Sequence, residues 1–464
     1  MLIFLQRNML LGGLLVYLGL CLAFGGAGRE GRYLHGVLQT IAAIGLFGLT
    51  VTWPERQKLL RLRVPISLVA SMVLIALVQS IPLPSIVWQS IPGREEIVRN
   101  FASLELPIGV MPISLDVEAT LSTIGYAFPP LFVLVLCNRV GGRRLKLVIP
   151  WVMSFAAVLS VVLGALQVFT GNNSSLYLYE ATNKGLPVGT FANVNHFANF
   201  LLITLPFTIF VFRDLSKNWQ TTDRSIATLF LAVATLLLLS IGIVAAGSLS
   251  VYLMSVPVLG LAFLFSRPEP ESPVRLWVPA AIGLAIVATS AAIATSPVLF
   301  GLGALGNIDH HLSRPNMWAT TWQAIQDHWL FGAGLGSYPS IIPLYEEPDT
   351  VTSTYLARAH NEYLQIFLEA GLLGIAVIGA AFVWLGQRAL AIWRHEHKSS
   401  MIAFRKVALI SIGVILLHSI IDFPARSPAI AAFLALFVGI ISVADSRRDV
   451  TTEIVSTDPK RVVL

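Results

Sequence analysis

The densest group of polar side chains in the sequence comprises Arg358, His360, Asn361 and Glu362. An imidazole titrates near neutral pH and can take a proton from a hydroxyl, whereas a guanidinium can hold a phosphate. A helix that begins at His360 or Asn361 would also direct free backbone N–H groups toward an anion. Glu369 follows on the face of Glu362, inside an apolar stretch where ionisable groups are usually functional or paired. A substrate site is therefore favoured here over a helix cap with solvated charges.

Arg314 is a second candidate. Pro315 suits the first turn of a helix, and Trp318, Trp322 and Trp329 recur behind it at helical spacing. We expect an amphipathic helix whose aromatic stripe packs on the membrane spans or lies at the interface. A cation at the start of a helix is not favoured by the helix dipole. Arg314 therefore needs an anionic partner.

Three other tracts carry polar residues. Asn193, Asn195 and His196 begin an apolar segment, where they can cap a helix or bind a substrate. His418, Asp422 and Arg426 follow at spacings of four, which predicts one helical face and a simple Asp–Arg pair. The glycines of residues 332–336 would let N–H groups approach an anion, although such a turn is usually only a turn.

Metal chemistry is the minority interpretation. His310 and His311 are adjacent, but no set of carboxylates and imidazoles surrounds them. The acidic turn at residues 346–349 is best explained as solvated charge. Glu362 and Glu369 are separated by about 10.5 Å of helix rise, too far to share one ion. We predict that the protein uses no metal and no cofactor.

The composition shows which elements must position these residues. Of 464 residues, 55% are hydrophobic and only 12% are charged, with a mean hydropathy of +0.76. Soluble domains carry about 25% charged residues. The chain therefore predicts an all-α polytopic membrane protein. Nucleic-acid binding is excluded because the basic residues form no dense face.

About twelve stretches are long and apolar enough to form transmembrane helices. They cover residues 9–27, 35–53, 64–83, 119–137, 147–170, 190–212, 226–247, 250–266, 276–300, 366–386, 407–424 and 428–445. The seventh and eighth form a tight hairpin.

Charge sets the orientation. Most of the 31 Lys and Arg residues fall in one set of alternate loops, which the positive-inside rule assigns to the cytoplasm together with both termini. The predicted organisation is then nine spans in residues 1–300 with an outer segment at 84–118, a large outer (periplasmic) loop at 301–365, three spans in 366–445 and a cytoplasmic tail at 446–464. All candidate residues fall on the outer side.

The tract from His360 to Gly374, HNEYLQIFLEAGLLG, resembles the signature of the O-antigen ligase and O-antigen polymerase superfamily. The tract Gly189–Asn199, the Arg314 to Trp318 spacing and the glycines of 332–336 are similar to its other marks, in the same order. The layout of twelve spans with a large penultimate outer loop also agrees. The resemblance covers nearly the whole chain.

This resemblance implies a metal-independent, inverting glycosyltransferase of the bacterial inner membrane, with its active face in the periplasm. It would move a glycan from an undecaprenyl diphosphate carrier to a hydroxyl of lipid A-core, of another glycan or of a protein. The family's active arginine and histidine map onto Arg314 and His360. Arg358, Asn361, Glu362, Glu369, Asn193, Asn195, His196, Arg426 and Asp422 are then candidate substrate-binding residues.

Two family cations are absent. The family often has an arginine where this chain has Val194, and Ser-Arg at the hairpin where this chain reads Gly247-Ser248-Leu249-Ser250. Arg426, Arg358 and Lys184 could replace them.

Two other functions stay open. A transporter or flippase of lipid-linked glycans would show repeats and broken midplane helices, and the sequence shows no repeat. A non-catalytic member of a polysaccharide export complex would explain the missing arginines.

Overall fold

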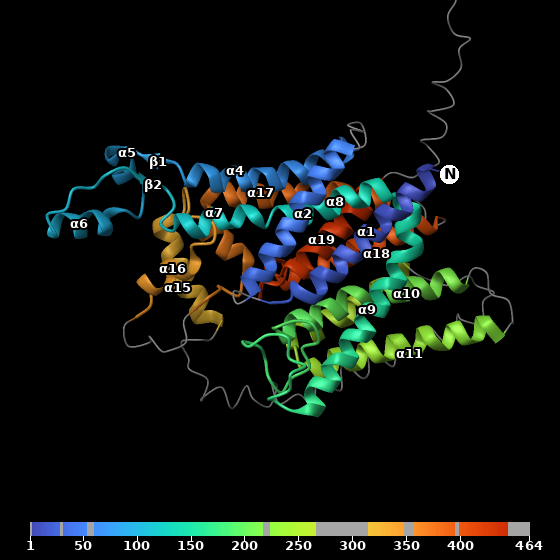
Figure 1. The fold of residues 1–464 in the computed structure, drawn as a ribbon. Coiled ribbons are helices and arrows are strands. Elements are labelled where there is room, and N and C mark those ends of the chain that lie inside the picture. The colour runs from blue at the N-terminus through green and yellow to red at the C-terminus, as the bar shows by residue number, and fades with distance from the viewer. Residues whose placement is uncertain are drawn as a thin grey trace, which may run out of the picture.

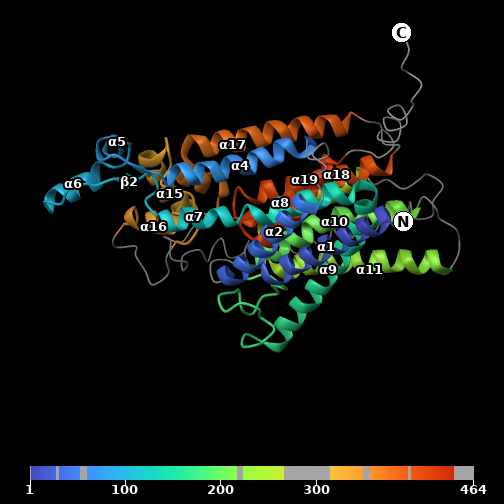
Figure 2. The same cartoon turned by 45° about the horizontal axis from the view of Figure 1, so that its top comes forward.

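The computed structural model describes residues 2–27, 31–52, 60–216, 223–265, 314–347, 356–394 and 399–443. It is a helical bundle with one short antiparallel hairpin (Figures 1 and 2). The longer helices are α1 (Leu2–Phe24), α2 (Arg32–Thr52), α4 (Arg63–Gln79), α8 (Phe128–Val140), α9 (Gly142–Thr170), α10 (Val194–Ser216), α11 (Asp223–Ala246), α12 (Leu249–Phe265), α15 (Arg314–His328), α17 (Glu362–Trp393), α18 (Ser400–His418) and α19 (Pro428–Ser442). The shorter elements are α5 (Ser85–Gln89), α6 (Glu95–Ser103), α7 (Val117–Gly125), α16 (Tyr338–Ile341), β1 (Pro82–Leu83) and β2 (Met111–Pro112).

Within the described chain, seven helices are long and apolar enough to cross a membrane, and four shorter apolar helices accompany them. They coincide with the stretches predicted from the sequence, apart from residues 276–300, which lie outside the described residues. The expectation of an all-α polytopic membrane protein is confirmed at this level. The predicted tight hairpin is also present, because Gly247 takes a φ of +69° between α11 and α12.

One span prediction needs correction. Residues 407–424 were expected to form a single helix, which would align His418, Asp422 and Arg426 on one face. Instead α18 ends at His418, and a short 3-10 turn covers Pro424–Arg426. Proline supplies no N–H for a continuing helix, so the chain turns before Pro424. Asp422 and Arg426 therefore point to different partners.

Helix α10 is the centre of the bundle. Nearly all of Val194–Val211 is buried, and the helix packs against α9, α11, α12 and α18. A helix that is apolar on every side is expected in such an interior position. Phe207 stacks on Phe437 of α19 with ring centroids 5.2 Å apart. Asn195 and His196 lie on the first turn of this buried helix.

Helix α17 is broken at Gly371, whose φ of 61° and ψ of −153° are not helical. The glycine-rich turn packs into the break, where Ala333 N–H donates to Leu368 O and Gly334 N–H donates to Glu369 O. Gln79 of α4 joins both segments, because its amide donates to Phe331 O and Glu369 O. These N–H groups are used in packing, so the turn does not form the anion cradle considered from the sequence.

The helices run roughly parallel, and the loops at one end of the bundle gather the candidate residues. We call this the α15 end, because α15 and α16 lie there together with a projecting arm of β1, β2, α5 and α6 (Figures 1 and 2). Helix α1 begins at the opposite end. The polar groups described next lie at the α15 end.

Candidate functional site

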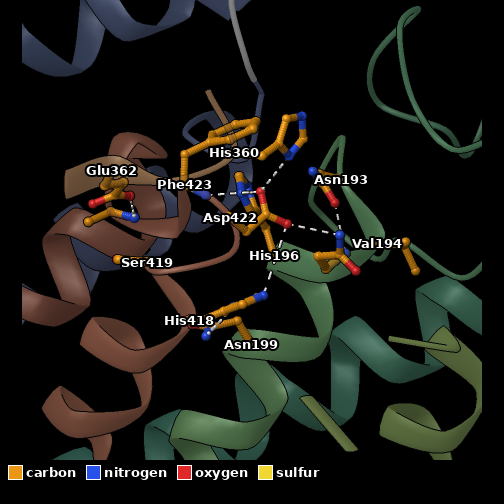
Figure 3. A network of polar contacts seen from close by, with 12 residues as sticks. Asn193, Val194, His196, Asn199, His360, Glu362, His418, Ser419, Asp422 and Phe423 are labelled. Carbon is orange, nitrogen blue, oxygen red and sulfur yellow. Dashed lines mark hydrogen bonds and ion pairs between the residues drawn. The ribbon is translucent and has the colours of Figure 1, made fainter. Parts of the chain in front are cut away.

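Asp422 is the centre of a polar network at the α15 end (Figure 3). Its side chain is fully buried, and its carboxylate accepts hydrogen bonds from Asn195 Nδ2 at 2.9 Å and from the backbone N–H of Phe423 at 2.9 Å. Three imidazoles surround it as well: His360 Nδ1 at 3.3 Å, and His196 Nε2 and His418 Nε2 at 4.0 Å each. The network joins α10, α17, α18 and the turn that follows α18.

The Asp422 carboxylate is an anion over the ordinary pH range. Burial alone would raise its pKa, but the contact from His360 and the imidazoles of His196 and His418 outweigh burial. They hold the pKa of Asp422 well below its usual range. The site therefore contains a fixed negative charge.

His360 is held in an uncommon conformation. Its φ of 48° lies in the left-handed region, which a side chain other than glycine rarely adopts. Such strain persists where surrounding contacts enforce it, and it clusters at functional sites. Here the ring lies against Phe423, with centroids 4.9 Å apart, and directs Nδ1 at Asp422. The other nitrogen points away from Asp422, and 30% of the side chain is exposed (Figure 3).

Arg314 begins α15 and reaches over the same carboxylate. Its Nη2 lies 3.9 Å from Asp422 Oδ2, and 40% of its side chain is exposed. Asp422 is thus the anionic partner that the sequence required for Arg314. Because the guanidinium has five N–H donors, contact with one carboxylate oxygen leaves donors for a substrate.

A second polar group contains Glu369 and Arg426. Arg426 Nη2 lies 3.0 Å from Glu369 Oε2, and Gln365 donates to Glu369 Oε1 at 2.8 Å. The Glu369 side chain is 1% exposed and that of Arg426 is 21% exposed. The expected Asp422–Arg426 pair is therefore wrong: Glu369 neutralises Arg426 instead.

The backbone N–H groups at the start of α17 also have hydrogen-bond partners within the protein. Asn361 caps the helix by accepting the N–H groups of Tyr363 and Leu364, and the N–H of Glu362 donates to Ser419 O. The expected anion site at this N-terminus is therefore not free. Glu362 is buried, and its carboxylate accepts the N–H of Ala425 at 2.7 Å.

An apolar cavity of about 420 Å³ lies beside this helix start. Its walls come from α4, α8, α17, α18 and α19, and Glu362, Ser419 and Tyr126 lie at its α15 end. Half-buried Arg358 lies close enough to Tyr126 to interact with it electrostatically. The cavity and the Asp422 network thus lie on either side of the start of α17.

The remaining predicted residues are divided between the network and the surface. Asn193 Oδ1 accepts the N–H of Asn195 and so orders the first turn of α10. Buried His196 packs edge-on against Phe423, with ring centroids 5.1 Å apart. Lys184 is exposed in the loop between α9 and α10, and none of the described ion pairs includes it.

Sequence reasoning did not single out two residues of this network, Asn199 and Ser250, and it named His418 only as part of a helical face. Asn199 Nδ2 lies 2.8 Å from His418 Nδ1, and His418 Nε2 lies 3.3 Å from Ser250 Oγ. The spacing from His196 to Asn199 places both on one face of α10, which was the available signal. Ser250 belongs to the hairpin where a family cation is absent, and only the fold brings it to α18.

Among the described residues, no three side chains of His, Cys, Asp or Glu are arranged to hold a metal ion. The Asp422 network is instead a carboxylate surrounded by nitrogen donors. The prediction of metal independence remains to be tested.

Comparison with known proteins finds a family model that matches part of the chain. The family model described as O-antigen ligase matches residues 234–379, which include Arg314, His360 and Glu369. The comparison with curated proteins finds no match. The match supports the resemblance seen in the sequence: residues 234–379 are similar to the O-antigen ligase family.

Proposed function

We propose that this protein transfers a glycan from a polyprenyl diphosphate carrier to a hydroxyl acceptor at the outer face of the bacterial inner membrane. The observation that carries the proposal is the contact of His360 Nδ1 with buried Asp422 at 3.3 Å, beneath Arg314. An imidazole oriented by a carboxylate, with its second nitrogen exposed, is suited to take a proton from a hydroxyl.

The reaction then proceeds by inversion. With its proton on Nδ1, the nitrogen that lies 3.3 Å from Asp422 Oδ1, His360 accepts the proton of the acceptor hydroxyl on the lone pair of Nε2. The hydroxyl oxygen forms a bond to the anomeric carbon while the bond from that carbon to the diphosphate oxygen breaks. The electron pair of the broken bond goes to the diphosphate, whose growing charge needs fixed cations.

In this proposal, two arginines hold the diphosphate. Arg314 keeps 40% of its side chain exposed, and its Nη2 is 3.9 Å from Asp422, so donors remain for phosphate oxygens. Arg358 interacts electrostatically with Tyr126, which lines the cavity, and the isoprenoid end of the carrier would pack against the apolar walls there. Arg426 contributes less, because it is already paired with Glu369.

The acceptor is a hydroxyl of lipid A-core, of a second carrier-linked glycan or of a protein. It approaches His360 from the exposed side of the imidazole, opposite Asp422. Asn361 and Glu362 support this arrangement by building the start of α17 rather than by contacting a sugar.

The direct test replaces His360 with alanine. Purified protein in nanodiscs is given undecaprenyl diphosphate carrying a labelled oligosaccharide together with a lipid A-core acceptor or a second donor, and release of undecaprenyl diphosphate is measured. Removal of a general base costs about a hundred- to ten-thousandfold in rate. We expect a loss of that size in H360A with normal membrane abundance and unfolding temperature.

Wild-type turnover in well-folded H360A would refute the assignment of His360. Movement of the labelled lipid across the bilayer without transfer would instead support a flippase.

A further inference from the structure

Three polar side chains lie behind Asp422 and have no part in the proposed reaction. His418 of α18 and Asn199 of α10 are fully buried, and Ser250 of α12 is 9% exposed. None of them can touch a substrate. Burying polar groups among apolar helices costs free energy unless they are hydrogen-bonded, and apolar side chains at these positions would pack the bundle at least as well. Packing alone therefore does not explain them.

Their hydrogen bonds set the protonation of His418. Asn199 Nδ2 lies 2.8 Å from His418 Nδ1. An amide nitrogen can only donate, so Nδ1 must accept, and a neutral imidazole then carries its proton on Nε2. That Nε2–H faces Ser250 Oγ at 3.3 Å and Asp422 Oδ2 at 4.0 Å.

The two oxygens of Asp422 face different partners. Oδ1 lies against His360 Nδ1, whereas Oδ2 receives Asn195 Nδ2 and faces Arg314 and His418. His418 Nε2 lies 4.0 Å from Oδ2, beyond hydrogen-bond distance, so it acts through the dipole of its N–H, whose positive end favours this orientation of the carboxylate.

We propose that Asn199 and His418 form a positioning pair that orients Asp422, and through it the proton-accepting His360. The proposal rests on the proposed function. Asn199 selects the tautomer of His418, and His418 then presents an N–H to the carboxylate from the side opposite the substrate. Groups of this kind, which orient a functional side chain from behind, can change activity roughly ten- to a hundredfold.

The test compares two replacements of His418. His418→Leu removes the donor, and we expect kcat to fall roughly ten- to a hundredfold with an unchanged KM for the labelled carrier. His418→Gln places an amide N–H near the position of Nε2–H, and we expect it to recover most of the activity. Equal losses in the two variants would overturn the proposal, because they would indicate packing alone.

Substitution of Asn199 provides a second test of the proposal. Asn199→Leu is expected to lower kcat, and the double variant with His418→Leu should be no worse than His418→Leu, since one residue acts through the other. Ser411→Ala is the matched control: Ser411 is buried on α18 and bonds to Ile203 O of α10, so it tests the same helix pair away from Asp422. We expect wild-type kcat in that control. Additive losses in the double variant would refute the link between Asn199 and His418.

A pH profile of kcat distinguishes a positioning role of His418 from a loss of packing in the variant. The titratable and charged groups that face Asp422 are His360, His196 of α10, His418 of α18 and Arg314 of α15. His418 helps to keep the pKa of Asp422 low, so the pKa of this carboxyl should rise when His418 is removed. The acid limb of kcat should therefore move to higher pH in His418→Leu and not in Ser411→Ala.

The outcomes also separate this proposal from the proposed function. If H360A keeps wild-type turnover, the assignment of His360 fails, and the positioning pair fails with it. If H360A is inactive while His418→Leu keeps wild-type kcat and pH profile, only the positioning pair is refuted.

Discussion

Asp422 illustrates what spacing can and cannot reveal about a single residue. The sequence marked its position, but it paired Asp422 with Arg426 on a helix that ends before either residue. The partners that are distant in sequence come from three separate segments, namely α10, the start of α15 and the residues just before α17. A carboxylate that collects donors from distant segments has no local sequence pattern, so only the fold could identify it as the centre.

His360 and Arg314 were predictable because their signals are local. An imidazole directly before a helix cap, and an arginine directly before Pro315 at a helix start, can both be recognised in one tract. Asp422, their common partner, could not be predicted in this way, because it lies far from Arg314 in the chain although the two side chains are 3.9 Å apart in space.

Substitution of Arg314 should weaken use of the carrier. A charge-assisted hydrogen bond contributes about 1.5–3 kcal/mol, so Arg314→Ala is expected to lower kcat/KM for the labelled donor roughly ten- to a hundredfold. Arg314→Lys should retain only part of the wild-type kcat/KM, because a lysine lacks the planar guanidinium that can bind two oxygens at once. Titration of turnover against donor concentration measures both effects. An unchanged kcat/KM in Arg314→Ala would remove this residue from the donor site.

The leaving diphosphate should be stabilised without a divalent ion. The proposed cations are Arg314 and Arg358, and in the described part of the chain no His, Cys, Asp and Glu cluster fits a metal. We expect transfer to continue at the wild-type rate in excess EDTA. Turnover lost in the chelator and restored by magnesium or manganese would contradict this prediction. A known magnesium-dependent glycosyltransferase treated in parallel shows that chelation is complete.

At the scale of elements, glycines and prolines explain most differences from the sequence-based expectations. Gly371 breaks α17 and admits the turn that carries Gly332, whose added Cβ would come within 2.3 Å of Glu369 O. A break of this kind depends on a partner turn from another part of the chain, so the sequence of α17 predicted one continuous helix. The apolar periodicity did place α15 and α17 correctly, because their long stripes are local features.

The packing of α15 against the arm should depend on pH. His328, near the end of α15, is buried, and burial together with the charge of Arg94 lowers its pKa to about 4. Its Nε2 contacts Tyr345, which donates to Asp327. The unfolded chain binds a proton near the ordinary pKa of 6.5, whereas the folded chain resists it. Stability is therefore complete above pH 6.5 and is lost as the pH falls from there toward 4.

The loss amounts to at most about 3 kcal/mol, at 1.36 kcal/mol for each unit of pKa. Limited proteolysis of residues 314–347 at pH 7.5 and pH 5 should show faster cleavage at the lower pH. His328→Gln cannot be protonated, and it should reduce the difference. Cleavage that is equally pH-dependent in His328→Gln would assign the effect to another group.

At the scale of the whole molecule, the loops between helices bring the candidate residues together at one end of the bundle. Asn195 of α10 and His360 just before α17 lie far apart in sequence, yet both contact Asp422. Composition predicted the class of the fold, since so few charges cannot cover a surface in water. It could not predict that α10 is the central helix, because nearly every span is apolar and the difference lies in which neighbours surround it.

The last prediction concerns the orientation of this bundle. Both native cysteines, Cys21 and Cys137, are fully buried, so single added cysteines can report on accessibility without removing them. Ser103 is exposed at the end of α6 on the arm, and Arg143 is exposed at the start of α9. The positive-inside rule puts Arg143 in the cytoplasm and the arm outside. A membrane-impermeant maleimide should therefore label Ser103→Cys in intact spheroplasts and Arg143→Cys only after permeabilisation, and the wild-type protein should stay unlabelled throughout. The reverse pattern would place Asp422 and His360 in the cytoplasm, where the proposed transfer at the outer face could not take place.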